Sequence, residues 1–189
     1  QDCDNVTHVT IPDGITTIGR YAFNGLTYTL TSVHIPNTVT KIETVAFGYI
    51  YYMQSITIPE SVVEIEASAF INCSDLTSIT IPNSVTYIGQ FALLCATLKA
   101  IYCYATTPPM IESLAVNYDA TLYIPCKSLE AYKAHDVWGQ FADIQCMLDE
   151  ESAVDNVTIS TTNTHKFLRN GQLLIIQDGV EYNVQGVKL

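Results

Sequence analysis

Side chains able to do chemistry are scattered widely along this sequence. Its 189 residues include six cysteines, 19 acidic residues and four isolated histidines, which are His8, His34, His135 and His165. By spacing, there is no nucleophile elbow, phosphate-binding glycine loop, zinc-type pair of cysteines or histidines, or calcium loop. Catalytic groups from distant positions can still meet in space. The pattern nevertheless favours a protein that is not an enzyme and that uses no metal or cofactor.

The cysteines divide into two groups. Three occupy places where other copies of an internal repeat carry leucine or isoleucine, and these are Cys73, Cys95 and Cys103. A position that accepts leucine, isoleucine or cysteine is a small apolar core site, so these three are predicted to be packed, reduced thiols. The state of Cys3, Cys126 and Cys146 stays open, and Cys126 with Cys146 is the first pairing to test.

The composition narrows the range of partners. The chain carries 8 basic against 19 acidic residues, a formal charge of -11, and 48% hydrophobic residues. Such a charge suits neither nucleic acid nor anionic lipid. No apolar run approaches the ~20 residues that a membrane-spanning helix needs. We expect an acidic, soluble protein that is secreted or held at the outer-membrane surface, and Gln1 in place of methionine suggests that a leader has been removed.

An internal repeat supplies the elements that must position these residues. Isoleucine-proline pairs recur at intervals of 24, 23 and 23 residues, at Ile11-Pro12, Ile35-Pro36, Ile58-Pro59 and Ile81-Pro82. An alanine follows eleven residues after each isoleucine, and the next residue is Phe23, Phe47, Phe70 or, in the fourth copy, Leu93. A period of roughly 20 to 30 residues is typical of a solenoid.

Each unit is predicted to be one coil of that solenoid. Ile56 and Ile58 alternate with Thr57, a period of two that predicts a half-buried strand, which the following proline ends. The segment Val62 to Ile65 and its equivalents are expected to turn the corner, and the alanine-phenylalanine pair to plug the coil. No single unit can bury so many apolar side chains alone, so the coils must stack.

The pattern changes after Lys99. Strands are predicted at Ile101–Tyr104 and Leu122–Pro125, and a short helix at Ser128–His135 with Ser128 as its N-cap. An apolar cluster to close the end of the core follows, formed by Trp138, Phe141 and Ile144. The last part of the chain predicts three short strands, Phe167–Arg169, Gln172–Gln177 and Val180–Val184, joined by Asn-Gly and Asp-Gly hairpin turns.

The pattern Ile-x-Ile-Pro, Val-x-x-Ile, Ala-Phe and Cys-x-x-Leu resembles the BspA-type leucine-rich repeat of surface proteins from anaerobic bacteria, over about residues 6–147. Residues Tyr102–Pro109, Leu122–Pro125, Leu129–Tyr132 and Trp138 resemble the ending of that family. The tail from Phe167 to Gly186 is similar to C-terminal sorting modules of the same bacteria. Leu93 departs from the family phenylalanine.

The resemblance implies a mainly β leucine-rich-repeat solenoid with short helical turns and terminal caps over residues 1–147. An acidic linker over 148–160 and a small β meander over 161–189 complete the predicted organisation. It also implies an exported surface protein that binds proteins or host components, and the tail implies sorting or attachment at the outer membrane.

Two sets of residues are candidates for ligand binding. If the strand isoleucines point inward, an outward column follows, rich in hydroxyls and aromatic toward the cap: Thr10, His34, Thr57, Thr80, Tyr102 and Tyr123, with Tyr104 beside it. A loop of the second unit presents Tyr49, Tyr51 and Tyr52 where its neighbours carry polar residues. Alternatively, the column is made of good strand formers, and the loop tyrosines cover the side of the coil.

Two functions remain in view. The first is adhesion, in which the sheet face of the solenoid binds a protein or glycan on host or bacterial surfaces. The second is a structural repeat that spaces or assembles surface components, in which case no surface patch should stand out and self-association should be measurable. The oligomeric state and the identity of the partner stay open.

Overall fold

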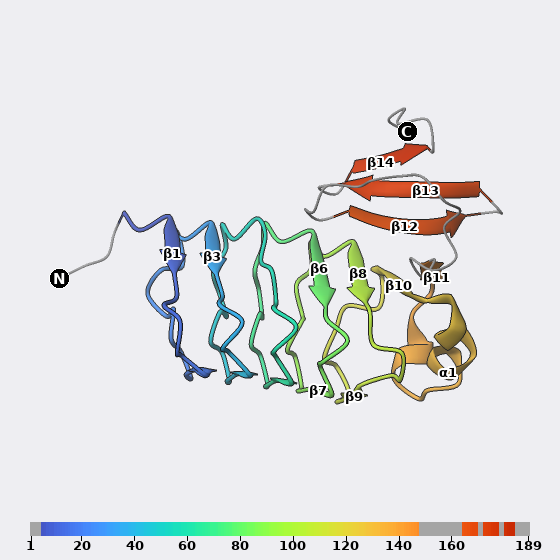
Figure 1. Cartoon of the computed structure of the whole chain (residues 1–189). Coiled ribbons are helices and arrows are strands. Elements are labelled where there is room, and N and C mark those ends of the chain that lie inside the picture. Colours follow the sequence, from blue (N-terminus) through green and yellow to red (C-terminus); the bar gives the residue numbers. More distant parts are fainter. Residues whose placement is uncertain (1–4, 148–163, 170–171, 178–179, 184–189) are drawn as a thin grey trace.

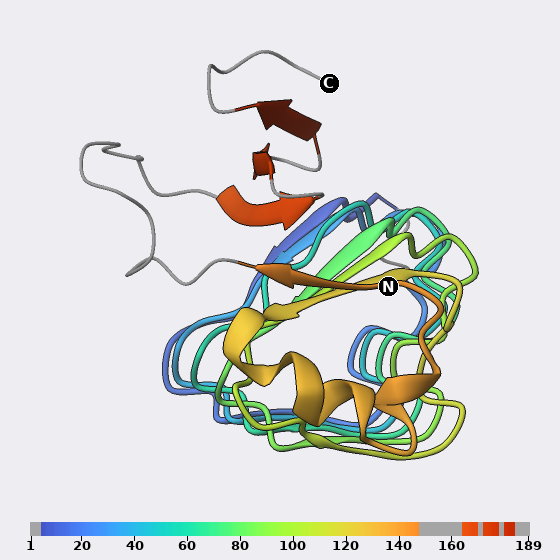
Figure 2. The ribbon, with the colours of Figure 1, turned by 90° about the vertical axis from the view of Figure 1, so that its right-hand side faces the viewer.

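The computed structural model describes residues 5–147, 164–169, 172–177 and 180–183 of the chain. Successive coils stack along one axis, and a short helix closes the far end of the stack (Figure 1). Seen down that axis, the coils superpose, so equivalent residues of neighbouring coils lie against each other (Figure 2). The predicted solenoid is confirmed.

The Ile-x-Ile-Pro segments and the equivalent segments of the later coils line one face of the solenoid, which we call the front sheet, although its strands form two hydrogen-bonded groups that are not joined at the third coil. Val9 pairs with Val33 and Ile79 with Ile101, so the inward residues of adjacent strands meet, as the alternation predicts. The parallel strands are β1 (His8–Thr10), which pairs with β3 (Ser32–His34), and further along β6 (Ser78–Ile81), β8 (Ala100–Cys103), β10 (Thr121–Pro125) and β11 (Ile144–Met147).

The third coil departs from the prediction. Ile56 and Ile58 point into the core and are only 8% and 4% exposed, yet Ser55–Ile58 forms no strand. Clefts on both sides separate this segment from β3 and from β6. The alternation of side chains encodes which residues face the core, whereas ladder hydrogen bonds also require contact between main chains. The predicted strand is therefore wrong here, although the predicted burial is right.

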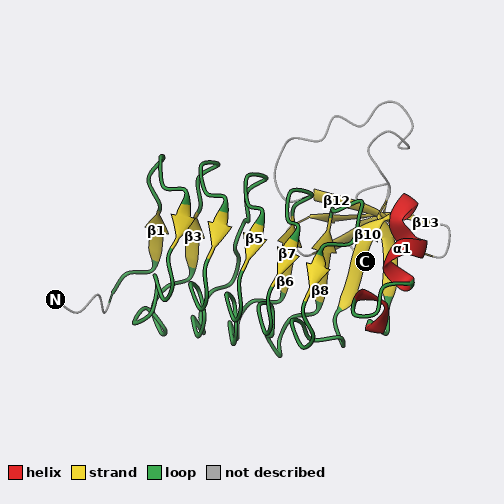
Figure 3. Cartoon of the chain, turned by 90° about the horizontal axis from the view of Figure 1, so that it is seen from below, coloured by secondary structure: helices red, strands yellow, loops and turns green. Residues whose placement is uncertain are grey.

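The Val-x-x-Ile segments do more than turn a corner. Each ends in a strand of two residues, and these strands form a second parallel sheet, the back sheet (Figure 3). Its inward isoleucines are all buried and stand in register, because each strand pairs with its neighbour residue for residue. The strands are β2 (Thr17–Ile18), β4 (Lys41–Ile42), β5 (Glu64–Ile65), β7 (Tyr87–Ile88) and β9 (Met110–Ile111).

The third side of each coil carries the alanine-phenylalanine pair. The residue before each alanine has a positive φ of 57 to 62°, and this set comprises Tyr21, Val45, Ser68, Phe91 and Leu114. The main chain can then donate to the next coil, as Phe47 N does to Ala69 O over 2.8 Å. The ring of Phe47 stacks on Phe23 and Phe70 with centroids 4.8 and 5.2 Å apart. The predicted plug is confirmed, and Leu93 fills it in the fourth coil.

The three cysteines predicted to be packed thiols, Cys73, Cys95 and Cys103, are free and buried. The first two donate to main-chain carbonyl oxygens of the preceding coil, Cys73 Sγ to Phe47 O over 3.2 Å and Cys95 Sγ to Phe70 O over 2.8 Å. Burial raises the pKa of the Cys103 thiol to about 11, so it stays protonated at neutral pH. All three therefore act as small core residues.

The pairing of Cys126 with Cys146 is confirmed as a disulfide. It joins the first residue of a 3₁₀ turn, η1 (Cys126–Ser128), to strand β11. Cys3 lies outside the described residues. The disulfide thus ties the last front strand to the closing helix.

The far end of the core is closed as predicted. Helix α1 (Leu129–Lys133) and the 3₁₀ turn η2 (Trp138–Gln140) lay Tyr132 and Trp138 over the last coil, both fully buried. The indole N–H of Trp138 donates to Pro109 O over 2.9 Å, so burial leaves this polar group satisfied. Phe141 is buried beside them, and Ile144 is half-buried.

The predicted N-cap is wrong. Ser128 makes no capping hydrogen bond to α1. Its hydroxyl donates instead to Thr106 O, 2.6 Å away in the preceding coil. A bond between coils has replaced a local one, and the helix is shorter than predicted.

The predicted C-terminal strands are present. They are β12 (Thr164–Arg169), β13 (Gln172–Gln177) and β14 (Val180–Asn183), an antiparallel meander. Met147 of β11 pairs with Phe167 of β12, so the meander continues the front sheet. Figures 1 and 2 show it lying over the front sheet at the cap end. The Asn-Gly and Asp-Gly turns and the linker over 148–160 lie outside the described residues.

Replacing Phe47 with alanine should remove the middle ring of the stack and leave a cavity between two coils. A buried phenylalanine cut to alanine costs about 3 to 5 kcal/mol, and the free energy of unfolding in urea should fall by that amount. Phe47→Leu is the matched control, because Leu93 already fills this place in the fourth coil. Equal losses for the two variants would contradict the ring stack.

Removing the disulfide with Cys126→Ser and Cys146→Ser should destabilise the chain by about 3 kcal/mol, because a cross-link over 20 residues restricts the unfolded chain. Urea denaturation measures this loss. In the same variant, Cys73, Cys95 and Cys103 should react with a thiol reagent only after unfolding. Rapid labelling of any of them in the folded protein would refute their assignment to the core.

Candidate functional site

The exposed part of the front sheet is the first candidate surface. Thr10, His34 and Thr57 are exposed and Thr80 is half-buried, so this part of the predicted outward column does face solvent. No charged residue lines the two clefts between its strands. The surface is therefore polar and neutral.

The two clefts flank the unpaired segment Ser55–Ile58. The larger, of about 360 Å³, lies beside β3 and brings together His34, Asn37 and Thr57. The smaller, of about 70 Å³, lies between Thr57 and Thr80. The main-chain N–H and C=O groups of Ser55–Ile58 make no hydrogen bond to any other described residue. This part of the sheet therefore offers main-chain as well as side-chain groups to a ligand.

The cap end of the same face is covered. Tyr102 and Tyr123 lie outside the main core as predicted, but they are only 5% and 4% exposed and form a second cluster with Met147. Their rings stack with centroids 4.8 Å apart. Tyr104 packs against this cluster and is half-buried.

The prediction that these tyrosines stand on an open face is therefore wrong. The sequence pattern of the solenoid gives no sign of the cause, which is that the C-terminal meander folds back over the front sheet at this end (Figure 2). Whether Tyr102, Tyr104 or Tyr123 contacts a ligand stays a prediction.

The loop tyrosines form a second candidate surface, which we call the tyrosine ridge. Tyr49 and Tyr52 are exposed, and Tyr51 is half-buried. A further tyrosine of the preceding coil, Tyr28, is 66% exposed and lies 5.3 Å from Tyr51 and 6.3 Å from Tyr52 between ring centroids. Sequence reasoning missed Tyr28, although its place one repeat before Tyr51 was a usable signal.

Charged groups gather on the back sheet instead. Lys41 Nζ lies 3.0 Å from Glu64 and 2.7 Å from Glu66. The hydrogen bond from Lys41 holds the pKa of Glu66 below its usual value, aided by hydrogen bonds from Thr44. Glu66 also accepts the Thr44 main-chain N–H, as Glu112 accepts that of Gln90, so these carboxylates connect one coil to the preceding one. These acidic side chains of the back sheet therefore have a structural role.

The titratable residues of the described ranges are the candidates for metal ligands and catalytic groups. Within the described ranges, no group of three histidine, cysteine or acidic side chains converges as metal ligands would. His135 Nδ1 accepts main-chain N–H groups from Val137 and Trp138, which orders the turn after α1. The part of the chain that the structure describes also contains no helix long and apolar enough to cross a bilayer.

Comparison with known families agrees with this geometry. Residues 1–114 match the family model described as "BspA type Leucine rich repeat region", in six copies. No curated protein sequence matches the chain.

The solved structures that are similar to this chain include the following three. The pneumococcal vaccine antigen PcpA is 18% identical with a TM-score of 0.54, and the match covers 76% of this chain and 42% of that one. A leucine-rich cell surface protein from Faecalibacterium prausnitzii is 19% identical, with a TM-score of 0.31 and coverage of 79% and 62%. A leucine-rich repeat protein from Bacteroides ovatus is 17% identical, with a TM-score of 0.33 and coverage of 80% and 65%. The chain thus spans less than two thirds of each, and the match to PcpA supports the fold.

Tyr123→Ser should destabilise the protein, because it removes one ring of a buried stack. We expect a loss of roughly 3 kcal/mol, near the lower end for a buried aromatic residue cut short. Hydrogen exchange followed by mass spectrometry should also speed up in β12 and β13, since part of the surface under the meander is gone. Thr57→Ser, on the exposed part of the same face, is the control. An unchanged stability for Tyr123→Ser would show that the meander does not cover this cluster in solution.

Proposed function

Because the chain belongs to the BspA-type leucine-rich repeat family, we propose that it is a cell-surface binding module. Its partner, a protein or a glycan, lies against the exposed part of the front sheet, from His34 through Thr57 to Thr80. We propose binding alone, without a catalytic step.

A single observation carries this proposal: Ser55–Ile58 makes no ladder hydrogen bonds to the rest of the described chain. Inside a continuous parallel sheet, every main-chain group is paired, and a partner finds only side chains. Here, unpaired N–H and C=O groups border clefts that also contain His34, Asn37 and Thr57. Such groups are able to form hydrogen bonds with a partner. A ligand with donors and acceptors in a row suits this segment.

The chemistry of the partner follows from the neutral lining. A peptide main chain or the hydroxyl groups of a glycan present donors and acceptors without net charge. A strongly charged partner would find no counter-charge in either cleft. The partner class is thus an extended peptide or a glycan chain, and salt should affect its affinity little.

The tyrosine ridge is the alternative site on the same protein. Exposed tyrosines give contact area at a small entropic cost and are enriched in binding surfaces. The ridge lies on loops, however, whereas the clefts lie between elements of a stacked core. We therefore favour the front sheet and treat the ridge as an outcome of the experiment.

We assign the protein to the cell surface. The Cys126–Cys146 disulfide supports export, since such bonds persist in oxidising compartments. The similarity of the tail to sorting modules supports a role for residues 161–189 in sorting or attachment at the outer membrane. The competing function is that of a spacer, in which the repeats only assemble other surface components.

A glycan array and a pull-down with host matrix proteins, both with the full chain, test this proposal. Once a partner is found, the double change His34→Ala and Thr57→Ala should weaken it at least about tenfold, which is about 1.4 kcal/mol. Thr10→Ala is the matched control, because Thr10 stands in the same column outside the clefts. It should bind as the parent does.

The remaining outcomes separate the alternatives. If only Tyr51→Ser with Tyr52→Ser loses binding, the ridge is the site and the front sheet is scaffold. If no partner is captured and sedimentation shows that the chain self-associates, the protein is a spacer and the binding proposal is wrong.

A further inference from the structure

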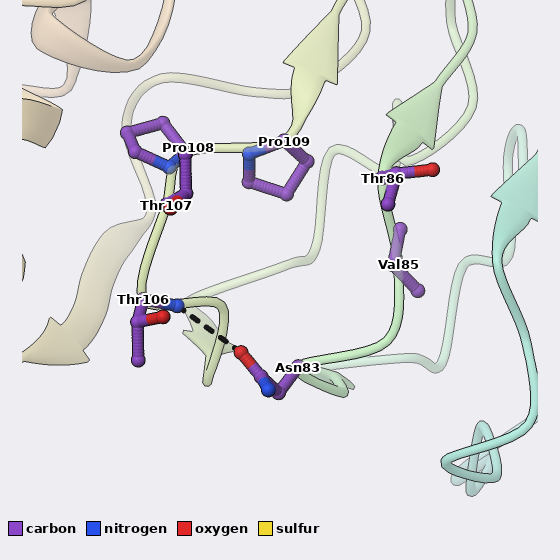
Figure 4. A pocket seen from close by; sticks show the side chains of 7 residues that line it. All are labelled: Asn83, Val85, Thr86, Thr106, Thr107, Pro108 and Pro109. Carbon is purple, nitrogen blue, oxygen red and sulfur yellow. Dashed lines mark hydrogen bonds between the residues drawn. The ribbon is translucent and has the colours of Figure 1, made fainter.

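A further pocket shares no lining residue with either candidate surface and lies between the fourth coil and the turn at residues 106–109 that leads into β9. Its volume is about 320 Å³. Figure 4 shows Asn83, Val85 and Thr86 on one side and residues 106–109 on the other. The Thr106 N–H donates to Asn83 Oδ1 over 3.2 Å and links the two sides. No charged residue lines the pocket.

The pocket interrupts a regular series of hydrogen bonds between coils. Along one side of the solenoid, a serine or threonine hydroxyl donates to a carbonyl oxygen 22 or 23 residues earlier. The bonds run from Thr38 to Ile15 O (2.8 Å), Ser61 to Val39 O (2.6 Å), Ser84 to Val62 O (2.7 Å) and Ser128 to Thr106 O (2.6 Å). We call this series the hydroxyl ladder.

One rung of the hydroxyl ladder is missing, and it is missing at the pocket. By spacing, Thr107 should donate to Val85 O, 22 residues earlier. Neither group is hydrogen-bonded to another described residue, and both residues line the pocket. The step from Cys103 to Ile111 is eight residues, where the step from Ile81 to Ile88 is seven. The extra residue lengthens the turn beside β9, and its two prolines stiffen it.

The unpaired groups define what would fit. One hydroxyl group of a ligand can accept a hydrogen bond from the Thr107 hydroxyl and donate one to the Val85 carbonyl oxygen at the same time. The Asn83 side-chain NH₂ is a further donor, since its Oδ1 is the atom that Thr106 uses. Pro108 and Pro109 add apolar C–H walls. The volume far exceeds the ~30 Å³ share of one water and lies at the lower end for ligand pockets.

We propose that this pocket binds one neutral sugar residue, the end or a branch of a glycan. One sugar hydroxyl takes the place of the missing rung between Thr107 and Val85 O, and another accepts from Asn83. A sugar combines several such hydroxyls with a C–H face that suits the prolines. In a peptide amide the donor and the acceptor are different atoms, so one amide replaces the missing hydrogen bond less well than one hydroxyl does. This site is separate from the front sheet and does not depend on the proposed function.

Titration of the full chain with glucose, galactose, mannose and N-acetylglucosamine, followed by amide NMR shifts, tests the proposal. At least one sugar should shift the signals of residues 83–86 and 106–107, with half-saturation at about millimolar concentration, as befits a binding free energy near -4 kcal/mol. The front-sheet variant His34→Ala with Thr57→Ala should show the same shifts. Failure of the proposed function and failure of this site can thus be told apart.

Two substitutions make opposite predictions. Thr107→Val removes the hydroxyl and keeps the shape, so it should weaken sugar binding at least tenfold and leave Tm unchanged, because no internal hydrogen bond is lost. Ser61→Ala removes an existing rung, so it should lower Tm and leave sugar binding unchanged. If Thr107 had only a structural role, Thr107→Val would lower Tm and leave sugar binding unchanged.

Several results would overturn the proposal. These are no shift with any of the four sugars, shifts confined to other parts of the chain, or sugar binding that Thr107→Val leaves intact. Shifts at the pocket with a neutral tripeptide such as trialanine, and with none of the sugars, would assign the pocket to peptides and would equally refute it.

Discussion

Registry between neighbouring coils is the constraint on which the rest of the structure depends. One coil of about 23 residues cannot bury its own isoleucines or satisfy its own main chain, so each does both against the next coil. The back sheet, the phenylalanine stack and the hydroxyl ladder repeat the same offset of 22 to 24 residues. Cys73 and Glu66 also reach the preceding coil, with offsets of 26 and 22 residues. A change at one coil is therefore felt first by its two neighbours.

The candidate sites lie where this registry is locally incomplete. At Ser55–Ile58 the side chains keep their places while the main chain loses its partners, and clefts open on both sides. At Thr107 an added residue breaks one rung, and a pocket opens. In the regular coils of the described chain, the ladders pair most main-chain polar groups with the neighbouring coil. Unpaired main-chain groups beside a cleft occur at departures from the repeat, a physical reason for seeking function in irregular coils.

The sequence predicted the features that repetition imposes and missed those that depend on a single contact. Inward isoleucines, the phenylalanine plug and the packed thiols follow from period and residue type, and all are present. The unpaired third coil could not be predicted, because alternation reports the direction of side chains and not the distance between main chains. Nor could the cover over Tyr102 and Tyr123, since it depends on where a segment far along the chain folds back.

The meander also limits the size of the ligand that the front sheet can bind. The edge strand of a sheet leaves a row of unpaired main-chain groups that invites unwanted pairing. Here the meander continues the sheet beyond β11 and covers its cap end. The outward column is therefore buried from Tyr102 onward. What stays open beside the unpaired segment runs from His34 to Thr80, three coils. A strip of three coils suits a short run of peptide or a few sugar units, and in the proposed binding role a larger partner would make its remaining contacts outside the front sheet.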